Sequence, residues 1–426
     1  MPALALIALL MLAAAGLASC AVAGAPPGEP APSPVPSAEG TPRRRPSPVP
    51  TAPGPAAPTP ITPPAGLASE RTLAFVSDRG GQTDLWLIDI ATRQLWRLTH
   101  DAAIESFPAW SPDGRMLAYV VEDERAVRNL WTLDLRAGVH RQLTREEPPF
   151  NVRRAAWLRG GRALIYDTGK PFDRRPELRV VTTEGETLAP LLPPSGEVVH
   201  DWSTDGATLV CAVGDPLGEP RIVATEAVPG AALRPDEGAP VGFAVELSPD
   251  GAYTTFSGPP LSNDQTTFVL DVISGREWPL NATVRGRRYE HDFAWSPDAR
   301  RLVFVHGAGG VTDGQGRLKT GAGPPPTSDP AVGLWIVERG APGREPEREQ
   351  LTIGSADAAP RWSPDGRWIA YLSDGVPPSP LESNIWLIAA EPDGQGWRRQ
   401  INLTAGNGNN WSPAWMPLPH GGAGGR

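Results

Sequence analysis

Two short runs of histidine and carboxylate residues have the side chains in this sequence best suited to acid–base chemistry. His200-Asp201 and Glu290-His291-Asp292 each place an imidazole beside a carboxylate. A carboxylate can orient such an imidazole as a general base, and two His–Asp pairs brought together could hold a divalent cation. The structural interpretation is that the carboxylates accept hydrogen bonds from backbone N–H groups at strand starts. It is favoured because no spacing motif supports a metal.

Other polar residues stand at corresponding places, just before strands that end in tryptophan. We expect this set to lie at the mouth of a channel and to form a binding site. Its members are Glu105, Arg153, Arg154, His200, Asp201, Glu290, His291, Asp292, Asp357 and Asn410. The sequence contains no G-x-S-x-G, H-E-x-x-H or P-loop motif, so no catalytic residue or metal ligand is assigned. No cofactor is expected, and a divalent cation is the alternative.

A recurring ten-residue phrase predicts the elements that position these residues. Residues 110–119 (WSPDGRMLAY) reappear as 295–304 (WSPDARRLVF) and 362–371 (WSPDGRWIAY), with looser copies that start at positions 157, 202 and 247. Ser-Pro-Asp-Gly suits a tight turn, because Pro presets φ, Asp tolerates the next position and Gly accepts a positive φ. Ala299 replaces this glycine, so its turn is either strained or of a different type.

Each repeat contains the pattern of four short strands. An apolar strand follows the turn, a Trp-containing alternating strand such as residues 84–89 comes next, and a strand that ends in Leu-Thr closes the unit. Four-stranded repeats of about 40–50 residues are typical of propeller blades. We therefore predict an all-β fold, a seven-bladed β-propeller of four-stranded blades. Six and eight blades are the alternatives, because the copies at 157 and 202 are degenerate.

The two ends of the repeat region complement each other. The first unit, from residue 71, lacks its innermost strand, and residues 411–415 supply a spare one. We expect this C-terminal strand to close the ring, since closure removes exposed strand edges. The propeller is predicted to span residues 67–418, with a disordered tail at 419–426.

The segment before the propeller predicts export. Residues 1–24 carry no charged side chain, and Leu17-Ala18-Ser19-Cys20 resembles a bacterial lipobox. Residues 1–19 are therefore expected to form a lipoprotein signal peptide, with Cys20 as the lipidated residue. An ordinary signal peptide and an uncleaved membrane anchor are the alternatives. Residues 20–66 are rich in proline and predict a disordered tether.

Composition limits the classes of partner. The formal net charge of the chain is −9, which disfavours nucleic acid as a ligand. Cys20 and Cys211 are the two cysteines, so acylation of Cys20 would leave no intrachain disulfide. Cys211 ends an apolar strand and is expected in the core.

One set of motifs carries a family resemblance. Residues 75–81 (FVSDRGG), the following Asp84-Leu85-Trp86 and the closing Arg97-Leu98-Thr99 resemble the TolB-type, WD40-like repeat of bacterial β-propeller proteins. The resemblance covers residues 70–417. It implies a propeller fold of the kind found in periplasmic binding proteins, peptidase propeller domains and exported lipoproteins.

These features together predict a function in recognition. The Ser-Pro-Asp-Gly turns share one face of a propeller, and the longer segments, of which 306–332 is the largest, share the opposite, loop-rich face. We expect an extracytoplasmic, membrane-anchored, monomeric lipoprotein that binds a protein, peptide or cell-envelope polymer through this face. The alternative is a channel-mouth hydrolase or lyase that uses the His–Asp pairs, with or without a divalent cation.

Overall fold

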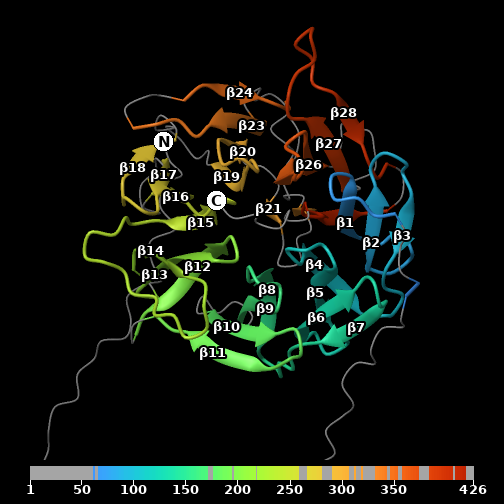
Figure 1. The fold of residues 1–426 in the computed structure, drawn as a ribbon, viewed down its shortest axis with the longest axis horizontal. Helices are drawn as coiled ribbons and strands as arrows, with labels where there is room; N and C mark the ends of the chain where they lie inside the picture. Colours follow the sequence, from blue (N-terminus) through green and yellow to red (C-terminus); the bar gives the residue numbers. More distant parts are fainter. Residues whose placement is uncertain are drawn as a thin grey trace, which may run out of the picture. The chain divides into compact units, whose positions relative to one another are not determined.

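The described part of the chain forms a ring of seven β-sheets. The structure is a computed structural model, and the described residues are 61–62, 66–170, 176–193, 196–216, 218–258, 266–280, 290–306, 311–312, 318–319, 332–342, 346–353, 357–373, 383–405 and 408–418. These residues contain strands and no helix, and the sheets surround a central axis as the blades of a propeller (Figure 1). The predicted all-β, seven-bladed propeller is confirmed. The predicted signal peptide, Cys20, most of the tether and the C-terminal tail lie outside the described residues.

Blades 1 to 3 each have four antiparallel strands, ordered from the inside of the ring outward. Blade 1 contains β29 (Asn410–Trp415), β1 (Thr72–Ser77), β2 (Asp84–Asp89) and β3 (Leu95–Arg97). Blade 2 contains β4 (Ile104–Trp110), β5 (Met116–Glu122), β6 (Arg128–Asp134) and β7 (Val139–Gln142). Blade 3 contains β8 (Asn151–Trp157), β9 (Ala163–Gly169), β10 (Glu177–Thr182) and β11 (Thr187–Leu191).

Blades 4 to 7 complete the ring. Blade 4 contains β12 (Val198–Thr204), β13 (Thr208–Gly214) and β14 (Arg221–Glu226), and blade 5 contains β15 (Phe243–Leu247), β16 (Tyr253–Ser257), β17 (Thr267–Asp271) and β18 (Glu277–Pro279). Blade 6 contains β19 (Glu290–Trp295), β20 (Arg301–His306), β23 (Gly333–Glu338) and β24 (Arg348–Gln350). Blade 7 contains β25 (Ala358–Trp362), β26 (Trp368–Ser373), β27 (Asn384–Ala389) and β28 (Gln400–Asn402).

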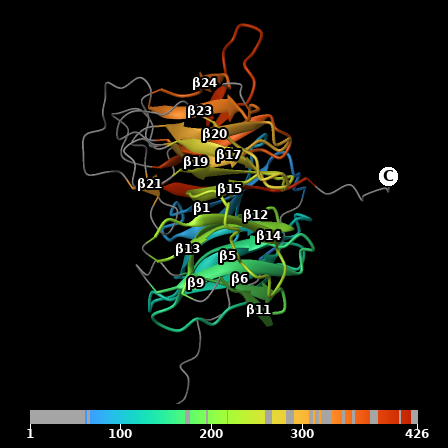
Figure 2. The same cartoon turned by 90° about the vertical axis from the view of Figure 1, so that its left-hand side faces the viewer.

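Two places depart from the regular blade. Blade 4 has three strands among the described residues. In place of a fourth strand, Val241 forms an isolated bridge with Arg221 of β14. Between β20 and β23, the short strands β21 (Val311–Thr312) and β22 (Leu318–Lys319) pair with each other. This ribbon belongs to the 306–332 segment, whose other described residues are those at its two ends, and it approaches β25. Figure 2 shows the ring edge-on, with β21 at one side of it.

The C-terminal strand closes the ring, as predicted. β29 pairs antiparallel with β1, with Leu73 opposite Trp415 and Ser77 opposite Asn410. Blade 1 is therefore built from both ends of the propeller. This pairing provides hydrogen-bond partners for backbone N–H and C=O groups at the inner edge of β1, which would otherwise be unpaired.

The Ser-Pro-Asp-Gly turns share one geometry. In blade 2, the Ser111 hydroxyl donates to Asp113 Oδ1 at 2.7 Å and accepts the Met116 N–H at 2.9 Å, while Gly114 has φ of +69°. The Ala299 turn contains the equivalent two bonds, and Ala299 has φ of +56°. The turn type is thus retained and a side chain occupies the left-handed region, so the strained alternative is confirmed.

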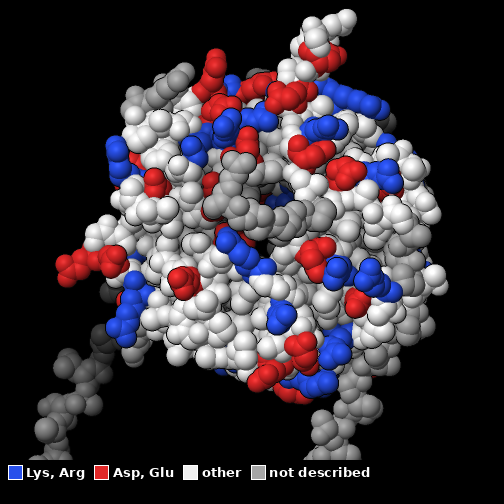
Figure 3. Space-filling model, viewed as in Figure 1, with Lys and Arg blue, Asp and Glu red and all other residues white. Residues whose placement is uncertain are grey.

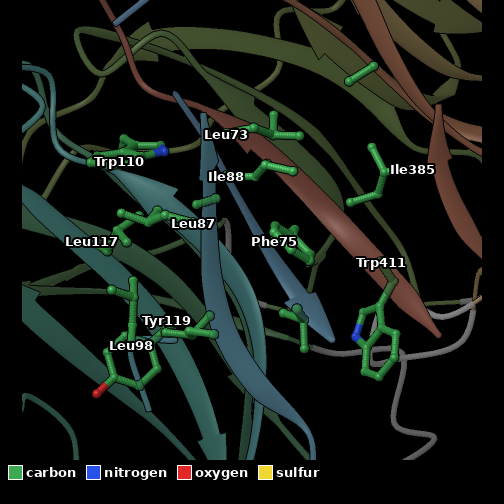
Figure 4. Close-up of a cluster of buried hydrophobic side chains, with 14 of the residues drawn as sticks. Leu73, Phe75, Leu87, Ile88, Leu98, Trp110, Leu117, Tyr119, Ile385 and Trp411 are labelled. Atoms are coloured by element: carbon green, nitrogen blue, oxygen red, sulfur yellow. The ribbon is translucent and has the colours of Figure 1, made fainter. Parts of the chain in front are cut away.

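Apolar side chains fill the spaces between neighbouring blades. Figure 4 shows one such cluster, in which residues from blades 7, 1 and 2 meet, including Ile385, Phe75, Trp411 and Trp110. Phe75 and Ile385 have no exposed surface. Because the core lies between sheets, each blade depends on both of its neighbours for burial.

The tryptophan at the end of an inner strand also joins blades by a hydrogen bond. In five blades, the indole N–H of this tryptophan donates to a backbone carbonyl of the preceding blade. The acceptor is the second-last residue of the inner strand in that preceding blade. The pairs are Trp110 to Ala414 (3.0 Å), Trp157 to Ala109 (2.9 Å), Trp295 to Glu246 (3.0 Å), Trp362 to Ala294 (3.1 Å) and Trp415 to Arg361 (3.1 Å). Trp202 differs: its buried indole N–H has no partner among the described residues.

The register of blade 4 explains this difference. In blade 2, β4 ends at Trp110, which pairs with Leu117. In blade 4, the strand continues past Trp202, and Thr204 still pairs with Leu209. Trp202 is therefore displaced along its strand, and its indole cannot repeat the bond made by the other tryptophans.

Both ends of the described propeller lie on the turn face, the face that carries the Ser-Pro-Asp-Gly turns. The Ile61 N–H donates to the Gly138 carbonyl at 3.1 Å, in the turn between β6 and β7. Gly138 has φ of +68°, and a Cβ there would lie 2.1 Å from the Ile61 carbonyl oxygen, so the contact requires glycine. At the other end, Met416 lies against Gly114.

Candidate functional site: the charged channel

The inner strands of most successive blades contact one another around the axis of the ring, and we call the space around this axis the channel. The residue before the terminal tryptophan is alanine in four blades (Ala109, Ala156, Ala294 and Ala414). In blade 5 and blade 7 the same position holds Glu246 and Arg361, which interact electrostatically. Figure 3 views the turn face and shows a central hollow there, with acidic and basic side chains around it.

Charged side chains from neighbouring blades surround the carboxyl of Glu246. Burial raises the pKa of its carboxyl to about 7. Arg361 and Arg154 oppose this shift, whereas the negative charges of Asp201 and Asp292 add to it. A carboxyl with this pKa changes charge near neutral pH.

Asp201 connects three blades. One of its carboxylate oxygens pairs with the guanidinium of Arg154 from blade 3, and the other accepts the Val245 N–H from blade 5 at 3.0 Å. The Arg154 guanidinium also lies over the Trp202 ring, 4.6 Å from its centroid. Burial opposes the charge of Arg154, but Asp201 and Asp167 outweigh it and raise the pKa of this arginine. Arg154 is therefore held as a fixed positive charge.

Asp292 makes the corresponding connection between blades 6 and 7. It lies at the bulge of β19 with φ of +53°, and its Oδ2 accepts the Ala359 N–H at 3.0 Å. Its Oδ1 lies 3.4 Å from His291 Nδ1. Burial opposes the charge of Asp292, but His291, the Ala359 N–H and Arg361 outweigh it and lower its pKa. The second predicted His–Asp pair is thus formed, and its carboxylate is ionised at neutral pH.

The first predicted pair has a different arrangement. His200 Nε2 lies 3.1 Å from the Asp215 carbonyl oxygen. Both oxygens of Asp201 already have partners in blades 3 and 5. Arg153 donates from Nη2 to the Lys170 carbonyl at 3.0 Å. His200 and Arg153 are therefore directed toward the loops after β13 and β9.

Three other predicted site residues are buried between strands. Glu290 accepts from Arg348 Nη1 at 3.0 Å. Asp357 has no exposed surface and accepts the hydroxyl of Thr352. Asn410, which is equally buried, accepts from Arg79 Nη2 at 2.7 Å. Their partners are protein side chains, whereas the structural interpretation had expected backbone N–H groups.

Glu105 is a special case among the buried residues. It has no exposed surface, and neither carboxyl oxygen has a hydrogen-bond partner in the described part of the chain. Burial, and then the charges of Asp101 and Asp84, raise its pKa to about 9. Glu105 is therefore a neutral carboxylic acid at pH 7.

The structure thus brings Arg154, Asp201, His291 and Asp292 together around Glu246 and leaves the other predicted residues apart. Glu246 and Arg361 were missed by the sequence analysis, which considered strand starts. The detectable signal was the break in the Ala-Trp pattern at their positions. Within the described ranges, no group of three His, Cys, Asp or Glu side chains is placed to hold a metal ion.

Comparisons with known proteins agree with the fold. Residues 79–157 match the family described as the dipeptidyl peptidase IV N-terminal region. An uncharacterized peptidase, YuxL of Bacillus subtilis (strain 168), is 25% identical over 195 residues. This match covers 45% of the present chain and 27% of that peptidase, so the chain corresponds to a minor part of its relative. Among the described residues, no helix is long and apolar enough to cross a membrane.

Solved structures show the same architecture. The β-propeller domain of the Trilobed protease from Pyrococcus furiosus, which has an open velcro topology, is 13% identical, with a TM-score of 0.52 over 79% of this chain and 95% of that chain. Oligogalacturonate lyase from Vibrio parahaemolyticus is 16% identical, with a TM-score of 0.52 over 76% and 87%. TolB from Acinetobacter baumannii is 14% identical, with a TM-score of 0.47 over 82% and 67%. By fold, the chain is a seven-bladed β-propeller.

Proposed function

We propose that this propeller is an exported binding scaffold that takes a protein, peptide or cell-envelope polymer at its loop-rich face. Part of the ligand enters the channel. The observation that carries the proposal is the cluster of Arg154, Asp201, Glu246, Asp292 and Arg361, which five successive blades contribute. Stability of the ring does not require charge beside the terminal tryptophan, because four blades have alanine there.

The geometry of the cluster favours recognition. Asp201 and Asp292 each accept a backbone N–H from the following blade, so their carboxylates are fixed before a ligand arrives. Groups that are already ordered lose little conformational entropy on binding. Charges in a partly desolvated channel also interact more strongly than charges in bulk water.

A matched pair of arginine variants in blade 7 tests this proposal. Arg361 is exposed near the end of the inner strand β25, whereas Arg367 is exposed in the Ser-Pro-Asp-Gly turn that follows and pairs with Asp365. Wild type, Arg361→Ala and Arg367→Ala would each be used to capture partners from a cell-envelope extract. We expect Arg361→Ala alone to change the amount of partner that is recovered. Equal recovery by all three proteins would overturn the proposed role of the channel.

We also propose that a lipid on Cys20 attaches the protein to the membrane on its extracytoplasmic side. The lipobox-like segment and the proline-rich stretch after it support this. Palmitate labelling of wild type and Cys20→Ser in cells checks the proposal. Equal labelling of the two proteins would refute lipidation at Cys20.

One observation favours a second function, that of a channel hydrolase or lyase. His291 and Asp292 form a pair at 3.4 Å, and the nearby Glu246 has a pKa of about 7, which suits a general acid or base. A divalent cation is an optional addition to this function. Turnover of lactone, glycoside or peptide substrates that His291→Ala abolishes would establish it. Wild-type inactivity on all three would count against it.

A further inference from the structure

Charge is distributed unevenly around the channel. Blades 4, 5 and 6 contribute the carboxylates of Asp201, Glu246 and Asp292. On the opposite side, blades 1 and 2 place the uncharged residues Ser412 and Phe107 at their bulges, with φ of +52° and +51°. The channel therefore has one acidic side, formed by three neighbouring blades.

The two arginines of the channel are already engaged by the protein. Arg154 forms the ion pair with Asp201 and lies over the Trp202 ring. Arg361 donates from Nη1 to the Pro360 carbonyl at 2.8 Å. Two guanidinium groups face three carboxylates, so the group as a whole is acidic when Glu246 is ionised.

Glu246 is the carboxylate of this group without a fixed partner. No described residue makes a hydrogen bond to its carboxyl oxygens, and its hydrogen bonds are made through the backbone carbonyl, which accepts from Trp295 and Thr254. Asp201 and Asp292, by contrast, are committed to neighbouring blades. Glu246 is thus the carboxylate best able to pair with a ligand.

We propose that the channel takes a positively charged group of a peptide, with Glu246 as its direct partner and with Asp201 and Asp292 adding to the attraction. This inference rests on the proposed binding function and specifies the ligand for the same site. The net charge of −9 on the chain attracts such a peptide at long range. Both signs of charge occur in the channel, which suits a peptide better than a polymer of uniform charge.

Three capped pentapeptides test the sign of the ligand charge. The probes are Ala-Ala-Lys-Ala-Ala, Ala-Ala-Glu-Ala-Ala and penta-alanine, each blocked at both ends and titrated into the purified protein by calorimetry. We expect the lysine peptide to bind at least tenfold more tightly than the other two. Tighter binding of the glutamate peptide, or no preference, overturns the inference.

The pH dependence of binding identifies the residue. The charged groups around Glu246 are Arg154, Arg361, Asp201 and Asp292, with His291 beside the last. Because its pKa is about 7, Glu246 is mostly ionised at pH 8 and mostly protonated at pH 6, so affinity for the lysine peptide should fall roughly tenfold between them. Glu246→Gln should bind weakly at both values.

Two control variants test whether the pH dependence belongs to Glu246. His291→Gln should keep the pH dependence, as should Glu186→Gln, which changes an exposed carboxylate before β11. Loss of the pH dependence in His291→Gln, or its retention in Glu246→Gln, overturns the role of Glu246. A preference for the glutamate peptide would leave the proposed binding function standing, whereas equal partner capture by Arg361→Ala would remove that function itself.

Discussion

The buried carboxyl of Glu105 leads to the sharpest prediction about stability. Its pKa in the folded protein is about 9, against 4.5 for an unperturbed glutamate. The folded state therefore holds its proton more tightly than the unfolded state. The protein is most stable below pH 4.5 with respect to this group, and it loses stability as the pH rises from 4.5 toward 9.

Glu105→Gln replaces the acid by a neutral group of similar shape that cannot ionise. For each pH unit between the two pKa values, the free energy of unfolding of the wild type falls by about 1.4 kcal/mol. Between pH 5 and pH 8, the wild type should lose up to about 4 kcal/mol relative to the variant. The amide of the glutamine stays uncharged at both pH values, so any cost of its missing hydrogen bonds is the same at pH 5 and at pH 8. The change with pH in the difference between the two proteins therefore reports the ionisation of Glu105.

Urea unfolding followed by tryptophan fluorescence at pH 5, 6.5 and 8 measures this difference. Glu186→Gln, at an exposed position, serves as the control and should parallel the wild type. The reasoning about Glu105 fails if Glu105→Gln differs from the wild type by the same free energy of unfolding at pH 5 and at pH 8. That result would show that the carboxyl finds a partner for its charge in the folded protein.

Three further predictions concern the ring itself. Trp157→Phe should reduce the free energy of unfolding by about 1–2 kcal/mol more than Trp202→Phe, because only the former removes an indole hydrogen bond; equal losses by chemical unfolding would refute this. Gly366→Ala should cost about 1 kcal/mol in the same assay, since φ is +71° and no atom obstructs a Cβ. Removal of residues 410–418 should expose β1 and lower the yield of monomer in gel filtration.

The fold was largely predictable because its signals are local. The Ser-Pro-Asp-Gly turns need particular residues at adjacent positions, and the same hydrogen bonds recur at Ser111 and Ser296. The unmatched strands at the two ends of the repeat region predicted the pairing of β29 with β1. The displaced Trp202 was not predictable, because its shift depends on where β12 pairs with β13.

The site was less predictable because it depends on how blades meet. The pairing of Arg154 with Asp201 links residues of different repeats, and no spacing along the chain reports it. Glu105 lies near the start of the inner strand β4 and Asp292 lies at the bulge of the inner strand β19, yet one is fully buried and the other lies in the channel group. Burial of this kind follows from the packing of neighbouring sheets, which the repeat pattern leaves unspecified.

The position of the two ends has a practical consequence. Ile61 at Gly138 and Met416 at Gly114 both lie beside turns that join strands on the same side of the ring. A carrier protein, an affinity handle or a sensor chip joined directly at residue 61 or after residue 418 would therefore lie on that side. The opposite face, which carries the longer loops, would stay open to solution, so protein immobilised in this way should keep its capacity for ligands that bind there.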